Sequence, residues 1–342
     1  MIVAVDTQLA VGTATGIGVY QRDLVAALRA RGIDVRALSA PWLDPWRFDR
    51  RLLWDQLLLP LAVARSGADL FHASGGTLPL LRRLPTVVTV HDLAWLRVQA
   101  HTRGYARAYF GALQSRAYRT AAAIVCDSQF TASEYRELIE PGRAVDVVPP
   151  GVDEAFARIV RQPDAAPFAL VVGTVEARKN LLAIVEALPA LPQLRVVSIG
   201  PFTPYAQRVR ARAQELGVAA RLDLRGYVPP DERDALYARA ALALVPSRYE
   251  GFGYALAEAM CAGLPAIAAR AAALPEVAGP GVPLVDPDDI AGWVTAIGDL
   301  LSGYQQAAAQ AAALRPAVIT NFSWAAAAER MQAVYARAAR AQ

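Results

Sequence analysis

The chain has 342 residues, of which 55% are hydrophobic and 19% are charged. At about 150 residues per domain this length predicts two domains, and the high apolar content excludes a disordered or low-complexity chain. The formal net charge of +4 is far below the excess that nucleic-acid-binding proteins carry, so we expect no nucleic-acid partner. Residues 1–150 hold 17 arginines against 13 acidic residues, so a local basic patch there could favour an anionic membrane surface or a phosphorylated substrate.

Two features of the sequence indicate a protein of the reducing cytoplasm. The two cysteines, Cys126 and Cys261, have apolar neighbours and lack the spacing of a metal site or a redox pair. The beginning of the chain has no positive segment ahead of an apolar run, and the apolar stretches 57–64 and 259–269 are too short to span a bilayer. We therefore expect a cytoplasmic chain that is neither exported nor integral to a membrane.

Short apolar runs alternate with segments of helical period in the first half of the chain. Residues 19–31 carry Leu24 and Leu28 on one helical face, whereas the runs around them are rich in β-branched residues. The strand-like runs are 2–6, 33–38, 86–92 and 122–128. This alternation is typical of βαβ units, so the first half predicts a parallel sheet.

The second half repeats the alternation, with clearer glycine and proline punctuation. The strand-like runs are 168–173, 194–200, 221–227, 241–247 and 264–269, and the helical segments are 183–188, 204–216, 230–239 and 253–261. The sequence therefore predicts an α/β fold of two doubly wound, Rossmann-like domains that face each other across a cleft.

The domain boundary is predicted where the alternation stops, near Gly151, and restarts, at Phe168. The predicted parts are a first domain at 1–150, a linker at 151–166 and a second domain at 167–324. An Ala-rich helix at 325–342 follows the second sheet. On pattern alone, this helix either packs back on the first domain or closes the second.

A glycine-rich loop follows one predicted strand of the second half. Ligands of open α/β sheets bind beyond the carboxyl ends of the strands, and this loop begins there with Glu250, Gly251, Phe252 and Gly253. The glycines let the backbone approach a ligand at a helix N-terminus, where N–H groups and the helix dipole suit a pyrophosphate. Glu258 lies eight residues after Glu250, an upper bound of about 12 Å along a helix, which is comparable to a nucleotide sugar. The alternative is that both carboxylates are merely solvated.

Lys179 is the only lysine among 35 basic residues. It stands beside Arg178 at the beginning of a predicted helix, after the strand end formed by Gly173 and Thr174. Two cations there could neutralise the charge that develops on a diphosphate leaving group. The alternative is an ordinary exposed pair of basic residues.

The first half offers weaker candidates. Gly16 and Gly18 open a predicted helix and resemble a phosphate loop, but Gln21 stands where the Gly-x-Gly-x-x-Gly pattern needs a third glycine. His91 directly follows a predicted strand and would point into the cleft. The alternative for His91 is a histidine that packs in the core with its hydrogen bonds satisfied.

Two stretches, 42–54 and 97–119, combine arginines with aromatic residues. Both could lie on lipid headgroups, because arginine and amphipathic aromatic rings suit the membrane interface. The alternative, which we favour for each stretch, is an amphipathic helix that packs its aromatic face on the first sheet.

The segment 246–269, PSRYEGFGYALAEAMCAGLPAIAA, resembles the Glu-x7-Glu signature of glycosyltransferase family 4, with Glu250 and Glu258 at the two acidic positions. Further segments are similar to the family in the same order along the chain: 88–96, 127–135, 147–153, 173–181 and 274–279. The family consists of retaining, sugar-nucleotide-dependent enzymes of the GT-B fold. The resemblance covers nearly the whole chain and implies that fold and that activity.

The resemblance also implies roles for the residues of the second domain. Glu250 would contact the donor sugar, Glu258 the ribose and Lys179 the diphosphate. Thr174 stands where many members have an arginine, and Arg178 is the candidate to replace it.

In the first domain, the resemblance implies that His91 contacts the reacting sugar and that Gly16 and Gly18 approach the phosphates. It also implies that the helix at 325–342 crosses back to the first domain.

The branch of the family with His-Asp-Leu and Gly-Thr-x-Glu-x-Arg-Lys-Asn resembles bacterial mannosyltransferases that build O-antigen or exopolysaccharide. This implies a hexose donor, GDP-mannose or a related GDP-sugar, and a saccharide or lipid-linked saccharide acceptor. The partners would then be the nucleotide sugar, the acceptor and the inner face of a membrane, contacted peripherally.

The resemblance implies transfer with retention, by front-face attack in which the departing phosphate helps to deprotonate the acceptor. Members need no divalent metal, so we expect neither a metal nor another cofactor. Two other hypotheses about the function stay open. Under these, the chain is either a catalytically silent protein that binds a sugar nucleotide, or a GT-B epimerase or hydrolase.

Overall fold

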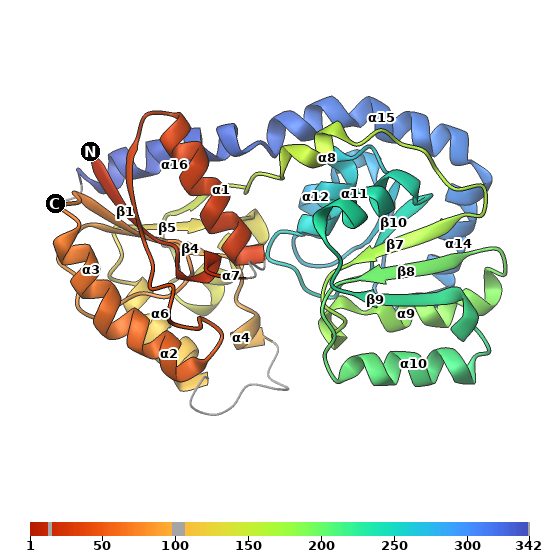
Figure 1. Ribbon diagram of the computed structural model, residues 1–342, viewed down its shortest axis with the longest axis horizontal. Coiled ribbons are helices and arrows are strands. Elements are labelled where there is room, and N and C mark those ends of the chain that lie inside the picture. Colours follow the sequence, from red (N-terminus) through yellow and green to blue (C-terminus); the bar gives the residue numbers. More distant parts are fainter. Residues whose placement is uncertain (13–15, 98–106, 341–342) are drawn as a thin grey trace. The chain divides into compact units, whose positions relative to one another are not determined.

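The computed structural model describes residues 1–12, 16–97 and 107–340 and divides into two compact units (Figure 1). Unit 1 comprises Met1–Gly151 and Phe322–Gln342, and unit 2 comprises Val152–Asn321. Most of the segment in which the sequence predicts a linker therefore belongs to unit 2, where it includes the short helix α8 (Glu154–Arg158). Residues 322–324 belong to unit 1 together with the terminal helix.

Unit 1 is built on a parallel sheet of six strands in the order β2-β1-β3-β4-β5-β6. The strands are β1 (Ile2–Asp6), β2 (Asp34–Leu38), β3 (Leu70–Ala73), β4 (Thr86–Val90), β5 (Ala123–Cys126) and β6 (Val145–Val147). The central strands β3 and β4 are buried along their whole length, as expected for parallel strands covered on both faces. The sequence pattern missed β3 and β6, which have only four and three residues.

Helices cover both faces of this sheet. The helical segments are η1 (Gln8–Ala10), α1 (Gly16–Ala30), α2 (Phe48–Leu53), the π-helical turn η2 (Trp54–Leu58), α3 (Leu59–Arg65), α4 (Ala94–Arg97), the π-helical turn η4 (Arg107–Leu113), α6 (Gln114–Tyr118), α7 (Gln129–Leu138) and α16 (Trp324–Ala338). One core lies under α1 and α16 and contains Tyr20, Leu24 and Met331. The other lies under the remaining helices and contains Trp54, Leu59 and Tyr135.

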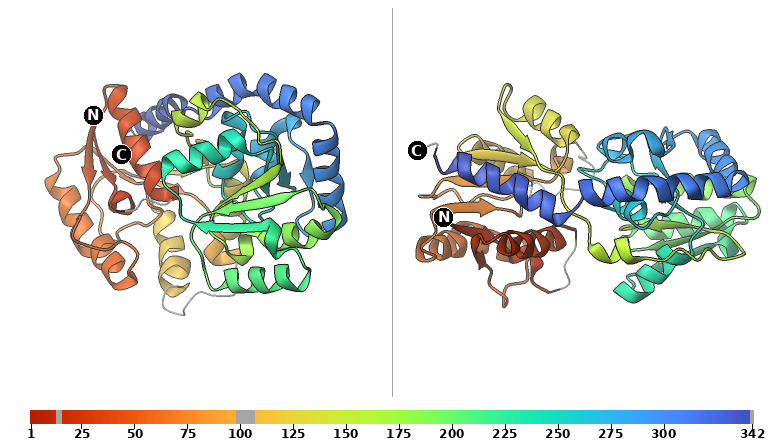
Figure 2. Two further views of the ribbon diagram at one scale, coloured as in Figure 1. Left: turned by 45° about the vertical axis from the view of Figure 1, so that its right-hand side comes forward. Right: turned by 90° about the horizontal axis from the view of Figure 1, so that it is seen from above.

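The terminal helix α16 packs beside α1, as the view from above in Figure 2 shows. Its Tyr335 is fully buried, and the Tyr335 hydroxyl lies 2.7 Å from His72 Nδ1 on β3. Unit 1 is therefore assembled from two separate segments of the chain, with all of unit 2 between them in the sequence.

Unit 2 contains a second parallel sheet of six strands, in the order β12-β11-β10-β7-β8-β9. The strands are β7 (Phe168–Val172), β8 (Arg195–Ile199), β9 (Leu222–Gly226), β10 (Leu242–Val245), β11 (Ala266–Ala269) and β12 (Leu284–Val285). The edge strand β9 alternates between exposed and half-buried residues, whereas β10 and β11 are buried throughout. The prediction of two doubly wound parallel sheets is confirmed.

The helices of unit 2 also lie on both faces of its sheet. The helical segments besides α8 are η5 (Ala177–Lys179), α9 (Leu181–Ala187), η6 (Leu188–Ala190), α10 (Tyr205–Glu215), η7 (Ala219–Arg221), α11 (Pro230–Arg239), α12 (Tyr254–Cys261), α13 (Leu274–Ala278), η8 (Gly279–Gly281), α14 (Ile290–Ser302) and α15 (Tyr304–Asn321). Helix α9 packs against α10 and α14, and α12 packs against α8 and α15 (Figure 1). In the part of the chain that the structure describes, no helix combines the length and the apolar character needed to cross a bilayer.

Candidate functional site

The strand order of unit 2 reverses between β7 and β10, which are hydrogen-bonded neighbours. At such a switch point the loops that follow the two strands diverge and leave room for a ligand at the carboxyl edge of the sheet. The loops here are 173–180 after β7 and 246–253 after β10. The Arg248 backbone N–H donates a 2.9 Å hydrogen bond to the Arg178 carbonyl, which joins the two loops.

Glu250 is held by both basic residues of the other loop. Lys179 Nζ lies 2.6 Å from Glu250 Oε1, and Arg178 Nη1 lies 3.3 Å from Glu250 Oε2. Burial alone would raise the pKa of Glu250, but Lys179, Arg178 and a hydrogen bond from Ser247 lower that pKa below its ordinary value. The structure therefore brings Lys179, Arg178 and Glu250 together, with Glu250 as a buried carboxylate anion.

The two cations are balanced by two carboxylates. Arg178 also binds a second acid, because its Nη2 lies 2.8 Å from Glu176 Oε1. Glu176 is the more exposed of the two acids, with 33% of its side chain accessible against 9% for Glu250. An anion that enters here competes with Glu176 and Glu250 for hydrogen bonds from Arg178 and Lys179.

Gly173 allows Lys179 to reach this position. Its φ of +134° is a conformation that residues with a side chain rarely adopt. A Cβ on Gly173 would lie 3.4 Å from Lys179 Cε and 3.6 Å from Lys179 Nζ, so the lysine side chain lies across the glycine. Thr174 follows and is half-buried.

The glycine-rich loop leads directly into α12. Gly251 and Phe252 are buried, and the Phe252 ring packs edge-on against Tyr254, 5.4 Å between centroids. Gly253 is the N-cap residue, with a left-handed φ of 108°. Because Gly253 has no side chain, the N-cap residue itself makes no side-chain hydrogen bond to the first turn of α12. The sequence prediction of a glycine-lined helix start is confirmed in this geometry.

Glu258, on the second turn of α12, has a different environment from Glu250. The Tyr237 hydroxyl on α11 donates a 2.8 Å hydrogen bond to Glu258 Oε2. Burial raises the pKa of Glu258 to about 7, although the Tyr237 hydrogen bond and the charge of Arg233 act in the opposite direction. At neutral pH one acid of the pair is thus ionised and the other is partly protonated.

In unit 1, His91 follows β4 and is hydrogen-bonded at both ring nitrogens. His91 Nδ1 lies 2.7 Å from Asp127 Oδ2, and His91 Nε2 lies 2.9 Å from the Ser74 carbonyl oxygen. The side chain of His91 is 12% exposed and that of Asp127 is 3% exposed. The Tyr20 ring of α1 lies edge-on to the imidazole, 4.7 Å between centroids.

Gly16 and Gly18 lie in the first turn of α1. Gly16 is exposed, and a Cβ added to it would meet nothing within 4 Å. Gly18 is buried, and the loop 13–15 that precedes them lies outside the described residues. Among the described residues, Gly16 therefore lies at the surface, whereas Gly18 packs inside the unit.

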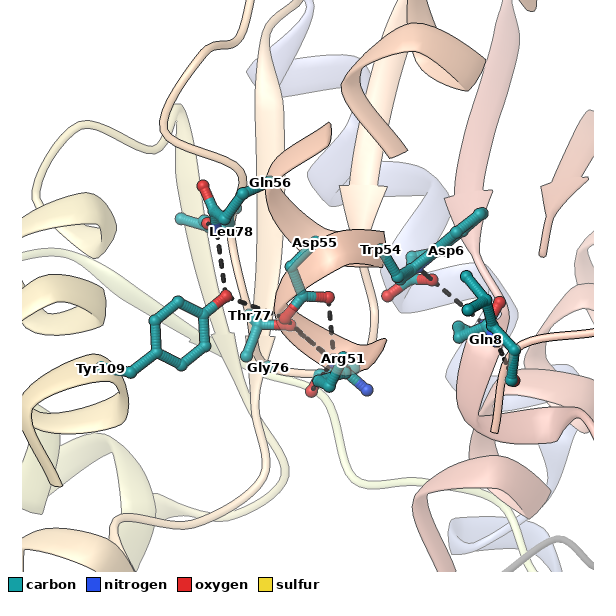
Figure 3. A network of polar contacts seen from close by, with 12 residues as sticks. Asp6, Gln8, Arg51, Trp54, Asp55, Gln56, Gly76, Thr77, Leu78 and Tyr109 are labelled. Atoms are coloured by element: carbon teal, nitrogen blue, oxygen red, sulfur yellow. Dashed lines mark hydrogen bonds and ion pairs between the residues drawn. The ribbon is translucent and has the colours of Figure 1, made fainter. Parts of the chain in front are cut away.

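A buried polar network lies where the strand order of unit 1 reverses, between β1 and β3 (Figure 3). Arg51 on α2 pairs with Asp55 on η2, with Nε 2.9 Å from Asp55 Oδ1. The same guanidinium donates to Thr77 Oγ1 in the loop after β3. The Tyr109 hydroxyl, from the π-helical turn η4, donates a 2.9 Å hydrogen bond to Asp55 Oδ2. The network therefore fastens the loop 74–77 to two helical segments.

Two sequence profiles match the chain. The profile described as glycosyl transferases group 1 matches residues 152–315, and the profile described as glycosyltransferase family 4 matches residues 14–156. The chain belongs to glycosyltransferase family 4.

Named relatives align with part of the chain. A GDP-mannose-dependent alpha-(1-6)-phosphatidylinositol monomannoside mannosyltransferase of Mycolicibacterium smegmatis is 30% identical over 224 residues, which is 58% of this chain and 57% of that protein. An O-antigen chain mannosyltransferase B of Escherichia coli is 34% identical over 128 residues, 36% of this chain and 34% of that protein. The chain thus spans about half or less of the length of these curated relatives.

The GT-B fold implied by the resemblance is confirmed by a solved structure. The sucrose-phosphate synthase of Thermosynechococcus elongatus superposes with a TM-score of 0.80 and covers 98% of both chains. At 23% identity this likeness shows the fold.

In this family 4 chain, the two basic aromatic stretches, 42–54 and 97–119, differ in how exposed some of their aromatic side chains are. In the first, Trp42 is 75% exposed and Trp46 is 56% exposed. In the second, Tyr109 and Tyr118 are buried in the core, as the packing alternative predicted, and residues 98–106 lie outside the described residues. Arg51, in the first stretch, is buried and ion-paired with Asp55, so it does not face a lipid surface.

Sequence reasoning missed several residues of these sites. Asp127 lies in the segment 127–135, which is similar to family 4. No spacing rule links Asp127 to His91, however, because the two residues are 36 positions apart. Tyr237 belongs to none of the motifs found in the sequence. Sequence reasoning also overlooked an Asp-x-Asp triplet, Asp286-Pro287-Asp288, and took the chain to have none. In the structure, Asp288 pairs with Arg248. Among residues 1–12, 16–97 and 107–340, no group of three or more His, Cys, Asp or Glu side chains is placed to hold a metal ion.

Proposed function

We propose that this family 4 protein transfers a hexose from a nucleoside diphosphate sugar to a saccharide or lipid-linked saccharide acceptor. The observation that carries the proposal is the convergence of Lys179 and Arg178 on Glu250 at the switch point of unit 2. Cations that are preorganised beside a bound diphosphate stabilise the charge that appears on it as the glycosidic bond breaks.

The positions of the other polar groups support a division of labour within unit 2. The diphosphate would lie at the glycine-lined N-terminus of α12, where the helix dipole favours an anion, within reach of Lys179 and Arg178. Glu250 would accept hydrogen bonds from hydroxyls of the transferred sugar. Glu258, on the second turn of α12, would accept hydrogen bonds from the two hydroxyls of the ribose. Arg178 would supply the contact that an arginine at position 174 makes in other members.

GDP-mannose is the proposed donor, because the mycobacterial relative is named as GDP-mannose-dependent. Isothermal titration calorimetry with GDP, UDP and dTDP, and with their hexose conjugates, tests this. GDP and GDP-mannose should bind more tightly than the others. Tighter binding of UDP or dTDP conjugates would exclude GDP-mannose as the donor but would leave the proposed hexose transfer unaffected.

Retention without a metal is proposed as the course of the reaction. The acceptor hydroxyl oxygen forms a bond to C1 on the face from which the phosphate departs, the bond between C1 and the phosphate oxygen breaks, and the hydroxyl proton passes to the departing phosphate. NMR of the product should show the anomeric configuration of the donor, and excess EDTA should leave the rate unchanged. Free sugar as the sole product would favour a hydrolase, an isomerised donor an epimerase, and tight binding without turnover a silent binding protein.

Contact with an anionic membrane surface is also proposed. Unit 1 carries a set of exposed large apolar side chains, here called the apolar surface of unit 1: Trp42, Trp46, Leu52, Leu53, Leu57, Leu61, Leu80 and Leu81. Leu53, Leu57 and Leu61 are spaced by four residues, so they share one face of the continuous helical segment 48–65.

Hydrogen bonds join the parts of the apolar surface of unit 1. Gln56 Oε1 accepts a 3.0 Å hydrogen bond from the Leu80 backbone N–H, which places Leu80 beside the helix that carries Leu57. Arg47 and Arg83 are exposed in the same segments. Apolar side chains flanked by arginines suit the boundary between acyl chains and anionic headgroups.

A further inference from the structure

The imidazole of His91 has no ring nitrogen left for a substrate. A carbonyl oxygen can only accept a hydrogen bond, so the 2.9 Å contact with Ser74 requires a proton on His91 Nε2. The 2.7 Å contact between His91 Nδ1 and Asp127 Oδ2 holds a second proton between an imidazole nitrogen and a carboxylate oxygen. The pair is therefore either an imidazolium beside a carboxylate or an imidazole beside a carboxylic acid.

The surrounding groups favour the ion pair. The titratable groups that face His91 within the described residues are Asp127, Asp92, Tyr20 and His72. Burial alone would lower the pKa of His91, but Asp127, the Ser74 carbonyl and Asp92 raise it above its ordinary value. Among the described residues, burial lowers the pKa of His72 to about 3 and raises the pKa of Tyr20, so neither adds a charge beside His91 at neutral pH. Burial also raises the pKa of Asp127, whereas the charge of His91 and its hydrogen bond lower it.

The Ser74 carbonyl is a fixed acceptor rather than a mobile loop atom. The Ser74 hydroxyl donates to the Asp6 carbonyl at the end of β1. The Tyr118 hydroxyl donates to the Gly76 carbonyl, and Arg51 donates to Thr77, as Figure 3 shows for the arginine. The buried network thus holds the loop on both sides of the atom that His91 contacts.

We propose that Asp127 and the Ser74 carbonyl hold His91 as an imidazolium at neutral pH, so that His91 positions its surroundings and takes no proton from an acceptor hydroxyl. Asp127 is then the positioning residue for His91, acting through one short hydrogen bond. The second half of this statement rests on the proposed transferase reaction, in which the hydroxyl proton goes to the departing phosphate. The first half rests on the two contacts of His91 and on the charged groups around it, all of them in unit 1.

NMR of the full chain labelled with 15N-histidine tests the first half without any activity. The sequence has three histidines, and His91→Gln assigns the signals of His91 by their loss. At about pH 7.5, both nitrogens of His91 should show the shifts of a protonated ring, whereas His72 should show a neutral ring. A neutral tautomer at His91 at that pH overturns the proposal.

The variant Asp127→Asn tests the role of Asp127. Removal of the carboxylate charge should lower the pKa of His91 enough that its ring is neutral at about pH 7.5. Glu134→Gln is the matched control, because Glu134 is a buried carboxylate of unit 1 that pairs with Arg97 and not with His91. It should leave the His91 signals unchanged. Retention of the imidazolium in Asp127→Asn would show that Asp127 does not hold the proton.

The pH dependence of kcat/KM tests the second half. The wild type should show no step from His91 between about pH 6 and 9, and Asp127→Asn should gain one. A wild-type step that coincides with loss of the His91 proton in the NMR titration overturns the claim that His91 exchanges no proton. Absence of any transfer reaction would remove the proposed function while leaving the NMR result intact.

Discussion

Tyr237 on α11 donates a 2.8 Å hydrogen bond to Glu258 on α12, so the acid of the proposed ribose site is bound by a neutral donor. Eight residues earlier, Glu250 is bound by two cations. Burial raises the pKa of Glu258 despite this hydrogen bond, whereas the two cations lower the pKa of Glu250, so the two acids of the Glu-x7-Glu signature have opposite pKa shifts.

The raised pKa of Glu258 predicts that the free energy of unfolding falls as the pH rises through neutrality. Its pKa rises from 4.5 to about 7 on folding, so between these values the folded state keeps a proton that the unfolded state releases. This contribution to the free energy of unfolding is full below pH 4.5 and is lost as the pH passes about 7. Urea unfolding at about pH 5 and pH 8 should show that Glu258→Gln removes about 1–3 kcal/mol of the difference between the two pH values. An unchanged difference in the variant would contradict the raised pKa.

Lys179→Ala should lower kcat by about 10²- to 10³-fold, because it removes one preorganised cation beside the leaving group. The measurement is steady-state transfer with the best donor found by calorimetry. Arg212→Ala is the control: Arg212 is a cation of unit 2 that pairs with Glu186 and Glu215, away from the loop 173–180. Near-normal turnover in a folded Lys179→Ala variant would exclude the proposed role of Lys179.

Glu176→Gln should strengthen the binding of GDP by about three- to tenfold, because Arg178 loses a competing carboxylate at 2.8 Å. Calorimetry with GDP alone measures the effect. Glu186→Gln, which removes one of the two carboxylates paired with Arg212 in unit 2, should leave the affinity for GDP unchanged. If Glu176→Gln weakens GDP binding instead, Glu176 orients Arg178 rather than competing with the diphosphate.

The double variant Leu57→Glu, Leu61→Glu should reduce co-sedimentation with vesicles of phosphatidylglycerol and phosphatidylcholine by about fivefold or more. Both side chains are exposed, 60% and 51%, so the substitutions should leave the fold intact. Tyr227→Glu is the control, because Tyr227 is 67% exposed but belongs to unit 2. Unchanged sedimentation of the double variant would show that the apolar surface of unit 1 is an ordinary exposed surface that does not contact the membrane.

The periodicity of the sequence predicts the long elements well, since α10, α11 and α12 begin and end within a residue or two of the predicted segments. It misses β3, β6 and β12, which are short, although it finds β5, β10 and β11, which have only four residues each. The residues of unit 2 that the sequence singles out lie together because they follow neighbouring strands. Asp127 and Arg51 could not be found in this way, since their partners are set by packing between segments far apart in the chain.

The return of α16 to unit 1 has a consequence for biosynthesis. A ribosome completes the whole of unit 2 before it makes the last helix of unit 1, and that helix supplies Met331 and Tyr335 to the interior of unit 1. During translation, therefore, the uninterrupted unit 2 can reach its final packing first, whereas residues 1–151 keep an uncovered apolar face until residues 322–340 have been made.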